Sequence, residues 1–287
     1  MKKIKYFLQF ICVIFFFVIF KILGLKLASI ISSNIFILFG PIFRSNKIVF
    51  SNLKIAFPNI DENQKKQILK KMWFNYGKIF AEYMFIKDFR HNEKYSAKIS
   101  IENKDIIEKI IKDNEQVIFI SGHFNNFELM AMQIEKLGIK LTALYRPLNN
   151  PYLNPIMEKI RKKYICKKQV KKGISGTKDL LLDFKDGSSI ALMIDQRVSQ
   201  GIRSNLFNKE ALTTTIPAQF IKKFKIRIVP VHVERQRDND FKIKFFEPVN
   251  FSNEESIETI TFKLNKILEE MIIKSPEQWI WTHNRWK

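Results

Sequence analysis

The chain has 287 residues, of which 46% are hydrophobic, so it is long enough for one large α/β domain with a small appendage and too apolar to be disordered. Its formal net charge of +21 predicts a surface that attracts phosphates, anionic headgroups or an acidic protein, although a compositional bias toward Lys, Ile, Asn and Phe accounts for part of the excess. No nucleic-acid-binding module is recognised, so we expect no nucleic-acid partner. Cys12 and Cys166 are too few for a disulfide framework, and no Cys/His cluster has zinc spacing, so we expect no metal.

Residues 1–43 are predicted to form a membrane anchor. Residues 6–20 carry no charge and follow three lysines, and a second apolar stretch continues to the end of the segment. No clean cleavage site follows, which favours an uncleaved anchor over a secretory signal. Because the uncharged run is shorter than the about 20 residues that span hydrocarbon, an interfacial helix or a shallow hairpin stands as an alternative to a spanning helix. Basic residues flank the run on both sides, so the positive-inside rule gives no orientation.

Residues 44–287 are predicted to form a single domain, because no Gly- or Pro-rich linker interrupts them. In chain order the patterns predict one or two helices over 62–85, then helices at 105–113, 127–137, 154–164, 177–187 and 254–273, with strands at 116–121, 141–147, 189–196, 225–235 and 241–249. The alternation of strands and helices predicts an α/β fold with a mostly parallel central sheet covered on both faces. Functional side chains are expected at the carboxyl ends of its strands.

The segment SGHFNNFEL, residues 121–129, is the strongest candidate for chemistry. His123 directly follows a predicted strand, and Glu128 comes five positions later in the first turn of the next helix. A neutral imidazole can take a proton from an alcohol near neutral pH, and a carboxylate can orient it and stabilise the imidazolium. We therefore predict His123 and Glu128 as the catalytic pair. The zincin and serine-hydrolase motifs that would indicate other chemistry are absent.

Five motifs, in this order and spacing, resemble the late acyltransferases of lipid A biosynthesis. They are SGHFNNFEL (121–129), YRPLNNP (145–151), LMIDQR (192–197), LFNKEALTTTIPAQF (206–220) and PEQWIWTHNRWK (276–287). The N-terminal apolar segment, residues 51–60 and the helix that ends GKIFAEYM are also similar, so the resemblance covers nearly the whole chain.

The resemblance implies a glycerolipid-acyltransferase-like α/β sandwich with an N-terminal membrane segment, the acyltransferase domain being residues 44–287. It implies transfer of a fatty acyl chain from acyl carrier protein, with no further cofactor, to the hydroxyl of a 3-hydroxyacyl chain on a lipid A precursor. His123 corresponds to the general base and Glu128 to its partner, with direct attack on the thioester and no covalent acyl-enzyme. The implied location is the inner membrane, with the catalytic domain on the cytoplasmic face.

Three positions depart from the family pattern. Asn125 and Asn208 stand where glycine is usual, and Phe127 stands where tryptophan is usual. Asn is the non-glycine residue that best tolerates a left-handed backbone, so we expect both turns to be kept.

Four further residues are predicted to bind substrate. Arg146 and Arg161 could contact phosphate or the developing oxyanion through the guanidinium fork, with a solvated basic face as the alternative. Asp195 ends a predicted strand, where it could hold an arginine or receive a substrate hydroxyl, and structural pairing is an equal alternative. Arg197 is a weaker candidate, because relatives often carry an acidic residue there. Residues 279–287 are interpreted as an aromatic segment packed on the domain, with charged tips at the membrane interface.

Two other functions are compatible with the sequence. One is an acyltransferase of the same fold that modifies another membrane lipid, such as a phosphatidylinositol mannoside or a glycerophospholipid, and only an acceptor assay separates it. The other is a basic membrane-surface binding protein without catalytic activity, which leaves the placement of His123 unexplained.

Overall fold

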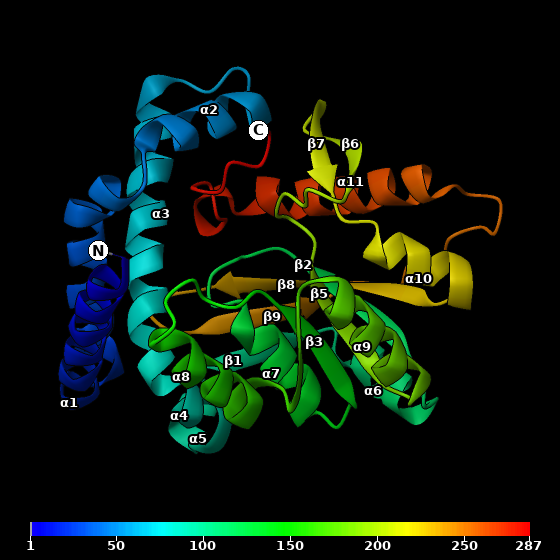
Figure 1. Cartoon of the computed structure of the whole chain (residues 1–287), viewed down its shortest axis with the longest axis horizontal. Coiled ribbons are helices and arrows are strands. Elements are labelled where there is room, and N and C mark those ends of the chain that lie inside the picture. The colour runs from blue at the N-terminus through cyan, green and yellow to red at the C-terminus, as the bar shows by residue number, and fades with distance from the viewer. Residues whose placement is uncertain (1) are drawn as a thin grey trace.

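The computed structural model describes residues 2–287, apart from the side chain of residue 174. Its centre is a seven-stranded sheet of order β1-β9-β8-β2-β5-β3-β4 (Figure 1). The strands are β1 (Ile99–Glu102), β2 (Val117–Ser121), β3 (Leu141–Tyr145), β4 (Lys168–Lys171), β5 (Ser189–Met193), β8 (Arg227–Arg235) and β9 (Phe241–Phe245). All neighbouring pairs are parallel except β8 and β9. The predicted α/β class with a mostly parallel sheet is therefore confirmed.

Helices cover both faces of this sheet, because successive side chains of a strand point to opposite sides. In β2, Val117 and Phe119 belong to one hydrophobic cluster, and Ile118 and Ile120 belong to another. The first cluster includes side chains from α4 (Ile86–His91), α6 (Lys104–Lys112) and α7 (Glu128–Lys136). The second includes side chains from α2 (Asn46–Ala56), α9 (Ile174–Lys185), α10 (Ile216–Phe224) and α11 (Ile257–Lys274).

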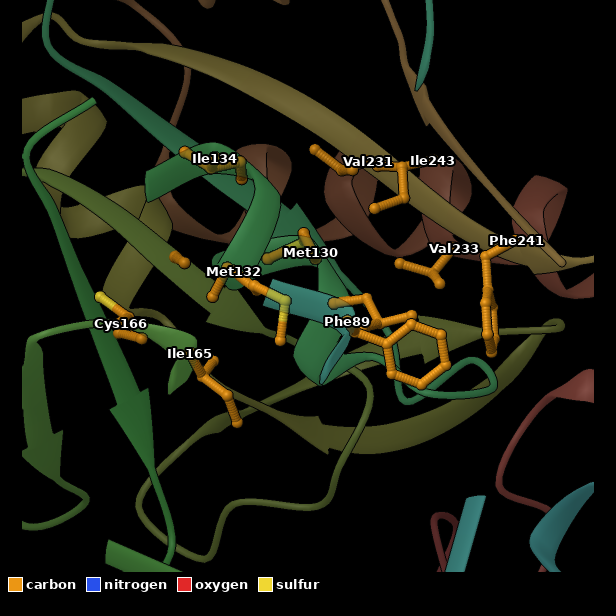
Figure 2. Packing of buried hydrophobic residues seen from close by; sticks show 14 of the residues in the cluster. Phe89, Met130, Met132, Ile134, Ile165, Cys166, Val231, Val233, Phe241 and Ile243 are labelled. Atoms are coloured by element: carbon orange, nitrogen blue, oxygen red, sulfur yellow. The ribbon is translucent and has the colours of Figure 1, made fainter. Parts of the chain in front are cut away.

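The first cluster fixes the position of α7. Figure 2 shows Met130 and Met132 of this helix within the cluster that also holds Val231 and Val233 of β8. Both methionines are fully buried. Because α7 is anchored on the sheet in this way, Glu128 at its first residue is held near the carboxyl end of β2.

The N-terminal apolar segment consists of two helical limbs that fold back on each other. It is assigned as one element, α1 (Lys2–Phe43), but Gly24 inside it has φ 75° and ψ 164°, a backbone conformation that glycine adopts at little cost. On a straight helix Phe17 and Phe36 would lie about 28 Å apart. Their ring centroids instead lie 5.1 and 5.5 Å from the ring of Phe80. The chain therefore reverses at Gly24, as Figure 1 shows.

Both limbs contact α3 (Glu62–Glu82) and leave an apolar face outward. At the contact the backbones are so close that a Cβ added to Gly77 would lie 2.4 Å from the Cα of Ser33. On the first limb the exposed large apolar side chains are Ile4, Phe7, Leu8, Ile11, Phe15, Val18 and Ile22, most of them three or four residues apart. The second limb exposes Leu27, Ile30, Ile31, Leu38, Phe39, Ile42 and Phe43. An outward face of this composition is typical of a surface that contacts lipid.

Several elements differ from the sequence-based expectation. The region 62–85 is one helix, α3, continued by a 3-10 turn, η1 (Tyr83–Phe85). The helix predicted at 154–164 is α8 (Leu153–Ile160) followed by a π-helical turn, η2 (Arg161–Ile165). The sequence predicted neither β1 and β4 nor the antiparallel hairpin of β6 (Ile202–Leu206) and β7 (Lys209–Thr213), and it predicted no helix at α2 or α10.

The two asparagines at usual glycine positions have left-handed backbones. Asn125 has φ 45°, and Asn208, in the turn between β6 and β7, has φ 58°. The expectation that asparagine keeps these turns is confirmed.

Candidate active site at the carboxyl ends of β2 and β5

His123 and Asp195 meet because they follow two neighbouring strands at the same offset. Strands β2 and β5 are parallel, and their register pairs Ser121 with Met193. Each functional residue lies two positions beyond that pair. The His123 Nδ1 atom is 2.7 Å from Asp195 Oδ1, and the His123 main-chain N–H donates to Asp195 Oδ2 at 2.8 Å. Two residues 72 positions apart in the chain thus form one unit.

Asp195 is held as a buried carboxylate. It has no exposed surface, and the indole N–H of Trp279 donates to its Oδ2 at 2.8 Å. Burial acts to raise the pKa of Asp195, but the positive charge that His123 can carry and the hydrogen bonds from His123 and Trp279 outweigh it, and the pKa lies below its usual value. An ionised carboxylate can only accept, so Nδ1 of His123 is the protonated ring nitrogen.

This arrangement leaves Nε2 of His123 free to act as a base. The side-chain amide nitrogen of Gln196 lies 3.3 Å from Nε2 and can donate to it, so Nε2 acts as an acceptor, as a base for a hydroxyl proton must. The ring of Phe127 packs at its edge with a centroid distance of 4.6 Å. A histidine fixed in this tautomer by a buried carboxylate can remove a proton from an alcohol and stabilise the charge it acquires.

Glu128 belongs to a second cluster beside His123. Its Oε1 atom accepts hydrogen bonds from Nε and Nη2 of Arg161 at 2.8 and 2.6 Å and from the Tyr83 hydroxyl at 2.5 Å. The sequence analysis predicted that Glu128 orients the His123 ring. Within residues 2–287, the carboxylate that hydrogen-bonds this ring is instead that of Asp195. Arg161 is also not on a solvated basic face, since its side chain is only 10% exposed.

A cavity of about 350 Å³ connects these two clusters. His123, Glu128, Arg161 and Gln196 form polar parts of its wall. Much of the apolar wall comes from α7, β3 and β5: Met130, Ala131, Ala143, Leu144, Ala191, Leu192 and Met193. Phe127, Leu148, Val198 and Ile216 add to it from the loops and from α10. The volume is in the range of small-molecule sites, and the small alanine side chains leave space between helix and sheet.

The residues that line the cavity include neither serine nor cysteine. Cys166 is buried elsewhere, and burial raises the pKa of its thiol to about 12. Cys12 is exposed on α1. Thr214 and Lys172 do line the cavity, but within residues 2–287 the hydrogen-bond partners of the His123 ring are Asp195 and Gln196. The base is therefore not paired with a serine, cysteine or threonine nucleophile.

The remaining predicted site residues have different surroundings. Arg146 is exposed and lines the cavity, together with a second pocket that adjoins it. Arg197 lines only the second pocket, and its main-chain N–H donates to His283 Nε2 at 2.9 Å. Asp195 lies beneath the imidazole without surface exposure, where it cannot receive a substrate hydroxyl directly.

The C-terminal segment packs on the domain, as the sequence indicated, but its Arg285 is buried in the interior and does not form a charged tip at a membrane interface, whereas Lys287 is exposed. Trp279, Trp281 and Arg285 have no exposed surface. The Arg285 guanidinium donates to the Leu212 carbonyl and the Thr213 hydroxyl, and burial lowers its pKa to about 10. Arg285 can be buried because protein oxygens replace water as acceptors.

The two asparagines of SGHFNNFEL hold the loop that carries His123. The Asn125 side-chain amide donates to the Val233 carbonyl at 2.9 Å, and that of Asn126 donates to the buried Glu82 carboxylate at 3.2 Å. Glu82 also forms a buried ion pair with Arg235. The loop is thereby attached both to β8 and to α3.

A histidine held by a buried carboxylate lines a largely apolar cavity in an α/β fold, an arrangement typical of enzymes that act on substrates with an apolar part. The profile of the family described as bacterial lipid A biosynthesis acyltransferase matches residues 1–287. The chain belongs to this family, and the resemblance inferred from its motifs is confirmed.

The relatives found in the comparison carry the same class of activity in their names. The chain is 25% identical over 255 residues to a lipid A biosynthesis lauroyltransferase of Escherichia coli, which covers 85% of this chain and 79% of the relative. It is 23% identical over 242 residues to the lipid A biosynthesis myristoyltransferase of the same organism, with 83% and 73% covered. A lipid A biosynthesis acyltransferase of Haemophilus influenzae is 25% identical over 259 residues, with 85% and 78% covered. Family membership supports acyl transfer to a lipid A precursor, and the apolar N-terminal helix fits association with a membrane.

Proposed function

We propose that the protein transfers a fatty acyl chain from acyl carrier protein to the hydroxyl of a 3-hydroxyacyl chain on a lipid A precursor. The observation that carries this proposal is the His123–Asp195 pair at the polar end of the cavity. Family membership supplies the substrate class, and the geometry supplies a base that is not hydrogen-bonded to a nucleophile.

In the proposed reaction, Nε2 of His123 takes the proton of the acceptor hydroxyl as its oxygen attacks the thioester carbonyl carbon. The carbon–sulfur bond then breaks, and the imidazolium returns the proton to the departing thiolate. The products are an ester and the free thiol of the carrier. Asp195 stabilises the imidazolium between the two steps. Direct transfer without an acyl-enzyme is supported by the partners of the His123 ring, which within residues 2–287 are Asp195 and Gln196 and not a serine, cysteine or threonine.

Glu128 has a different part in this proposal from Asp195. By pairing with Arg161 it holds the guanidinium in the cavity wall, where hydrogen-bond donors can stabilise the oxyanion of the tetrahedral intermediate. Tyr83 supports the same pair from α3, and burial raises the pKa of Tyr83 well above its usual value, so its hydroxyl remains a donor. Arg146 and Arg197 are proposed to contact the polar part of the substrate.

The apolar part of the cavity is proposed to take the acyl chain, and the sandwich is proposed to be of the glycerolipid-acyltransferase type. The outward apolar face of the α1 limbs would rest in the membrane. Because acyl carrier protein is cytoplasmic, we place the protein on the inner membrane with residues 44–287 on the cytoplasmic face.

The proposal is tested by mass spectrometry of lipid A from cells with and without the gene, complemented with wild type, His123→Ala or His91→Ala. We expect one acyl chain to be missing without the gene and with His123→Ala, and to be restored by wild type. His91→Ala is the matched control, because His91 is exposed on α4 and does not line the cavity.

The possible outcomes separate the alternatives. If lipid A is unchanged while a glycerophospholipid or another membrane lipid loses an acyl group, the proposed acceptor is wrong and the proposed acyltransferase activity is kept. If His123→Ala restores the missing chain as well as wild type does, the assignment of the base is wrong. A gene whose loss changes no lipid would favour the non-catalytic binding protein.

A further inference from the structure

A strongly basic pocket adjoins the cavity that contains His123. Its volume is about 780 Å³, and its wall includes Arg44, Arg146, Lys172, Arg197 and Lys287 but no aspartate or glutamate. Arg146 and Lys172 also line the cavity, as do Pro147, Gln196 and Val198, so the two spaces share a wall. We call the side chains of Arg44, Arg146, Lys172 and Arg197 the basic cluster.

Two members of the basic cluster are direct neighbours. Strands β3 and β4 are parallel, and their register pairs Tyr145 with Lys171, so the next residues, Arg146 and Lys172, also lie side by side. The Lys172 main-chain N–H donates to the Tyr145 carbonyl at 2.7 Å, which extends the pairing past the strand ends. Like charges at such positions repel each other. The Lys172 side chain is exposed, but partial desolvation and the charge of Arg146 lower its pKa.

The repulsion is not balanced by acidic side chains. Within residues 2–287, Arg44, Arg146, Lys172 and Arg197 form no salt bridge. Cations elsewhere are paired, such as Arg90 with Glu135. Arg197 is the partly engaged member, since its Nε donates to the Lys287 main-chain oxygen at 3.2 Å. Cations that converge without a counter-charge are suited to bind an anion.

We propose that the basic cluster binds a phosphate ester of one of the two substrates. A guanidinium presents paired donors to phosphate oxygens, and an ammonium adds a point charge, so the arginines and Lys172 together match a phosphate group. The phosphate comes either from the sugar of the acceptor or from the thiol-bearing arm of the donor. To name these two sources, we rely on the proposed acyl transfer. The proposal that the basic cluster binds phosphate does not depend on it.

The first test measures binding without catalysis. The melting temperature of the purified full chain is followed with increasing glucose 1-phosphate, with glucose as the uncharged control and sodium chloride keeping ionic strength constant. A ligand that binds the folded state raises the melting temperature in a saturable way. We expect this rise for wild type and for Lys112→Gln, an exposed charge-loss control on α6, and its loss in Arg146→Gln/Lys172→Gln. The unliganded melting temperature of each variant shows that it is folded.

The second test identifies the source by steady-state kinetics of the same variants. If the phosphate is that of the acceptor, Arg146→Gln/Lys172→Gln should raise KM for the acceptor roughly tenfold, with KM for the donor and kcat within about twofold of wild type. A rise confined to KM for the donor would assign the phosphate to the donor.

The proposal is overturned if glucose 1-phosphate gives wild type no saturable shift, or if the double variant responds as wild type does. Unchanged KM values for both substrates would also overturn it. A protein that responds to glucose 1-phosphate through these residues but acylates no lipid A precursor would refute the proposed function and leave the phosphate site intact.

Discussion

His123 can act as a base only if one ring nitrogen is fixed as a donor and the other is left free. Asp195 meets this need, because it is ionised, buried and in contact with both the ring and the main chain of His123. Glu128, only five residues from His123 in the chain, instead fixes a guanidinium. Closeness in sequence was therefore a poor guide to which carboxylate holds the imidazole.

Asp195→Asn should lower kcat by about 10³- to 10⁴-fold, because an amide at this position favours the wrong imidazole tautomer. Glu128→Gln should cause a smaller loss, since it removes the charge of the Arg161 partner and leaves the tautomer of His123 unaffected. Single-turnover rates with saturating donor and acceptor measure both effects, and melting temperatures control for folding. The assignment fails if Asp195→Asn is nearly as active as wild type while Glu128→Gln is inactive.

The sequence was sufficient to predict His123, because a histidine directly after a buried strand is placed by local pattern alone. Glu128, Arg146 and Arg161 were also predicted, and all three line the same cavity as His123. The partnership with Asp195 was not predictable, since it depends on β2 and β5 being neighbours in register. The sequence analysis missed Gln196, Tyr83 and Trp279. In a single sequence, nothing distinguishes these side chains from ordinary residues of the core or of a strand end.

Among the elements, the C-terminal segment contributes directly to the site. It continues from η3 (Pro276–Gln278), and its first tryptophan donates to Asp195. Gln278 meets the loop that carries His123, since its main-chain oxygen accepts from the Asn125 main-chain N–H at 3.0 Å. The segment therefore hydrogen-bonds both the Asp195 carboxylate and the loop that carries His123.

Trp279→Phe should lower kcat about five- to tenfold with little change in KM, because the ring is largely kept and a hydrogen bond to a charged group is lost. Trp286→Phe is the matched control, as its indole N–H donates to the Leu206 carbonyl at 3.0 Å and not to Asp195. Steady-state kinetics and melting temperatures of both variants are compared. Equal effects on kcat would indicate that Trp279 contributes packing alone.

The α1 hairpin favours one reading of the lysines that flank the apolar run on both sides. A chain that reverses at Gly24 can keep both flanks on one side of a membrane, with its outer face in the lipid. Lys21, close to the bend, pairs with Asp88 of α4 at 2.5 Å and so points to the protein.

Tags placed before Lys2 and after Lys287 should therefore lie on the same side of the membrane. Accessibility to a membrane-impermeant protease is measured in right-side-out and inverted vesicles. A spanning helix would put the two tags on opposite sides and would contradict the hairpin arrangement.

Most long helices and buried strands were predictable from hydrophobic periodicity, while β1, α2, α10 and several other elements were not. Strand β4, with sequence KQVK, has one buried residue and too little apolar pattern to identify. The β6–β7 hairpin alternates weakly and depends on Asn208 and Phe207 at positive φ. The bend of α1 is set by one glycine in a run that is apolar almost throughout.

At the scale of the whole molecule, the charge of +21 favours association with acidic partners. Screening acts over about 10 Å at 0.1 M salt. Raising sodium chloride should therefore raise KM for the acyl carrier protein donor, whereas KM for an uncharged acyl-pantetheine donor should stay constant. An unchanged KM for the carrier protein between low and high salt would refute a role for the overall charge.

Stability should fall as the pH is lowered from about 6.5 toward 4. Burial lowers the pKa of His232 and of His283 to about 4, so the unfolded chain binds protons at these residues before the folded protein does. Their neutral forms favour the folded state fully above pH 6.5, and this contribution is lost down to pH 4. Urea midpoints measured across this range should fall, and His232→Leu should reduce the slope; a flat profile would contradict the burial of neutral histidine.

The close contact between the α1 limbs and α3 makes the anchor and the catalytic domain one rigid body. Ser33 lies against Gly77, and the ring of Phe80 packs between the rings of Phe17 and Phe36 from the two limbs. Within residues 2–287, the α1 limbs are therefore packed directly on α3. If the outer face of α1 rests in the membrane as proposed, the enzyme searches for its acceptor by lateral diffusion at a fixed height. Its rate then follows the number of acceptor molecules per unit of membrane area, and adding inert lipid slows the reaction even when the bulk acceptor concentration is unchanged.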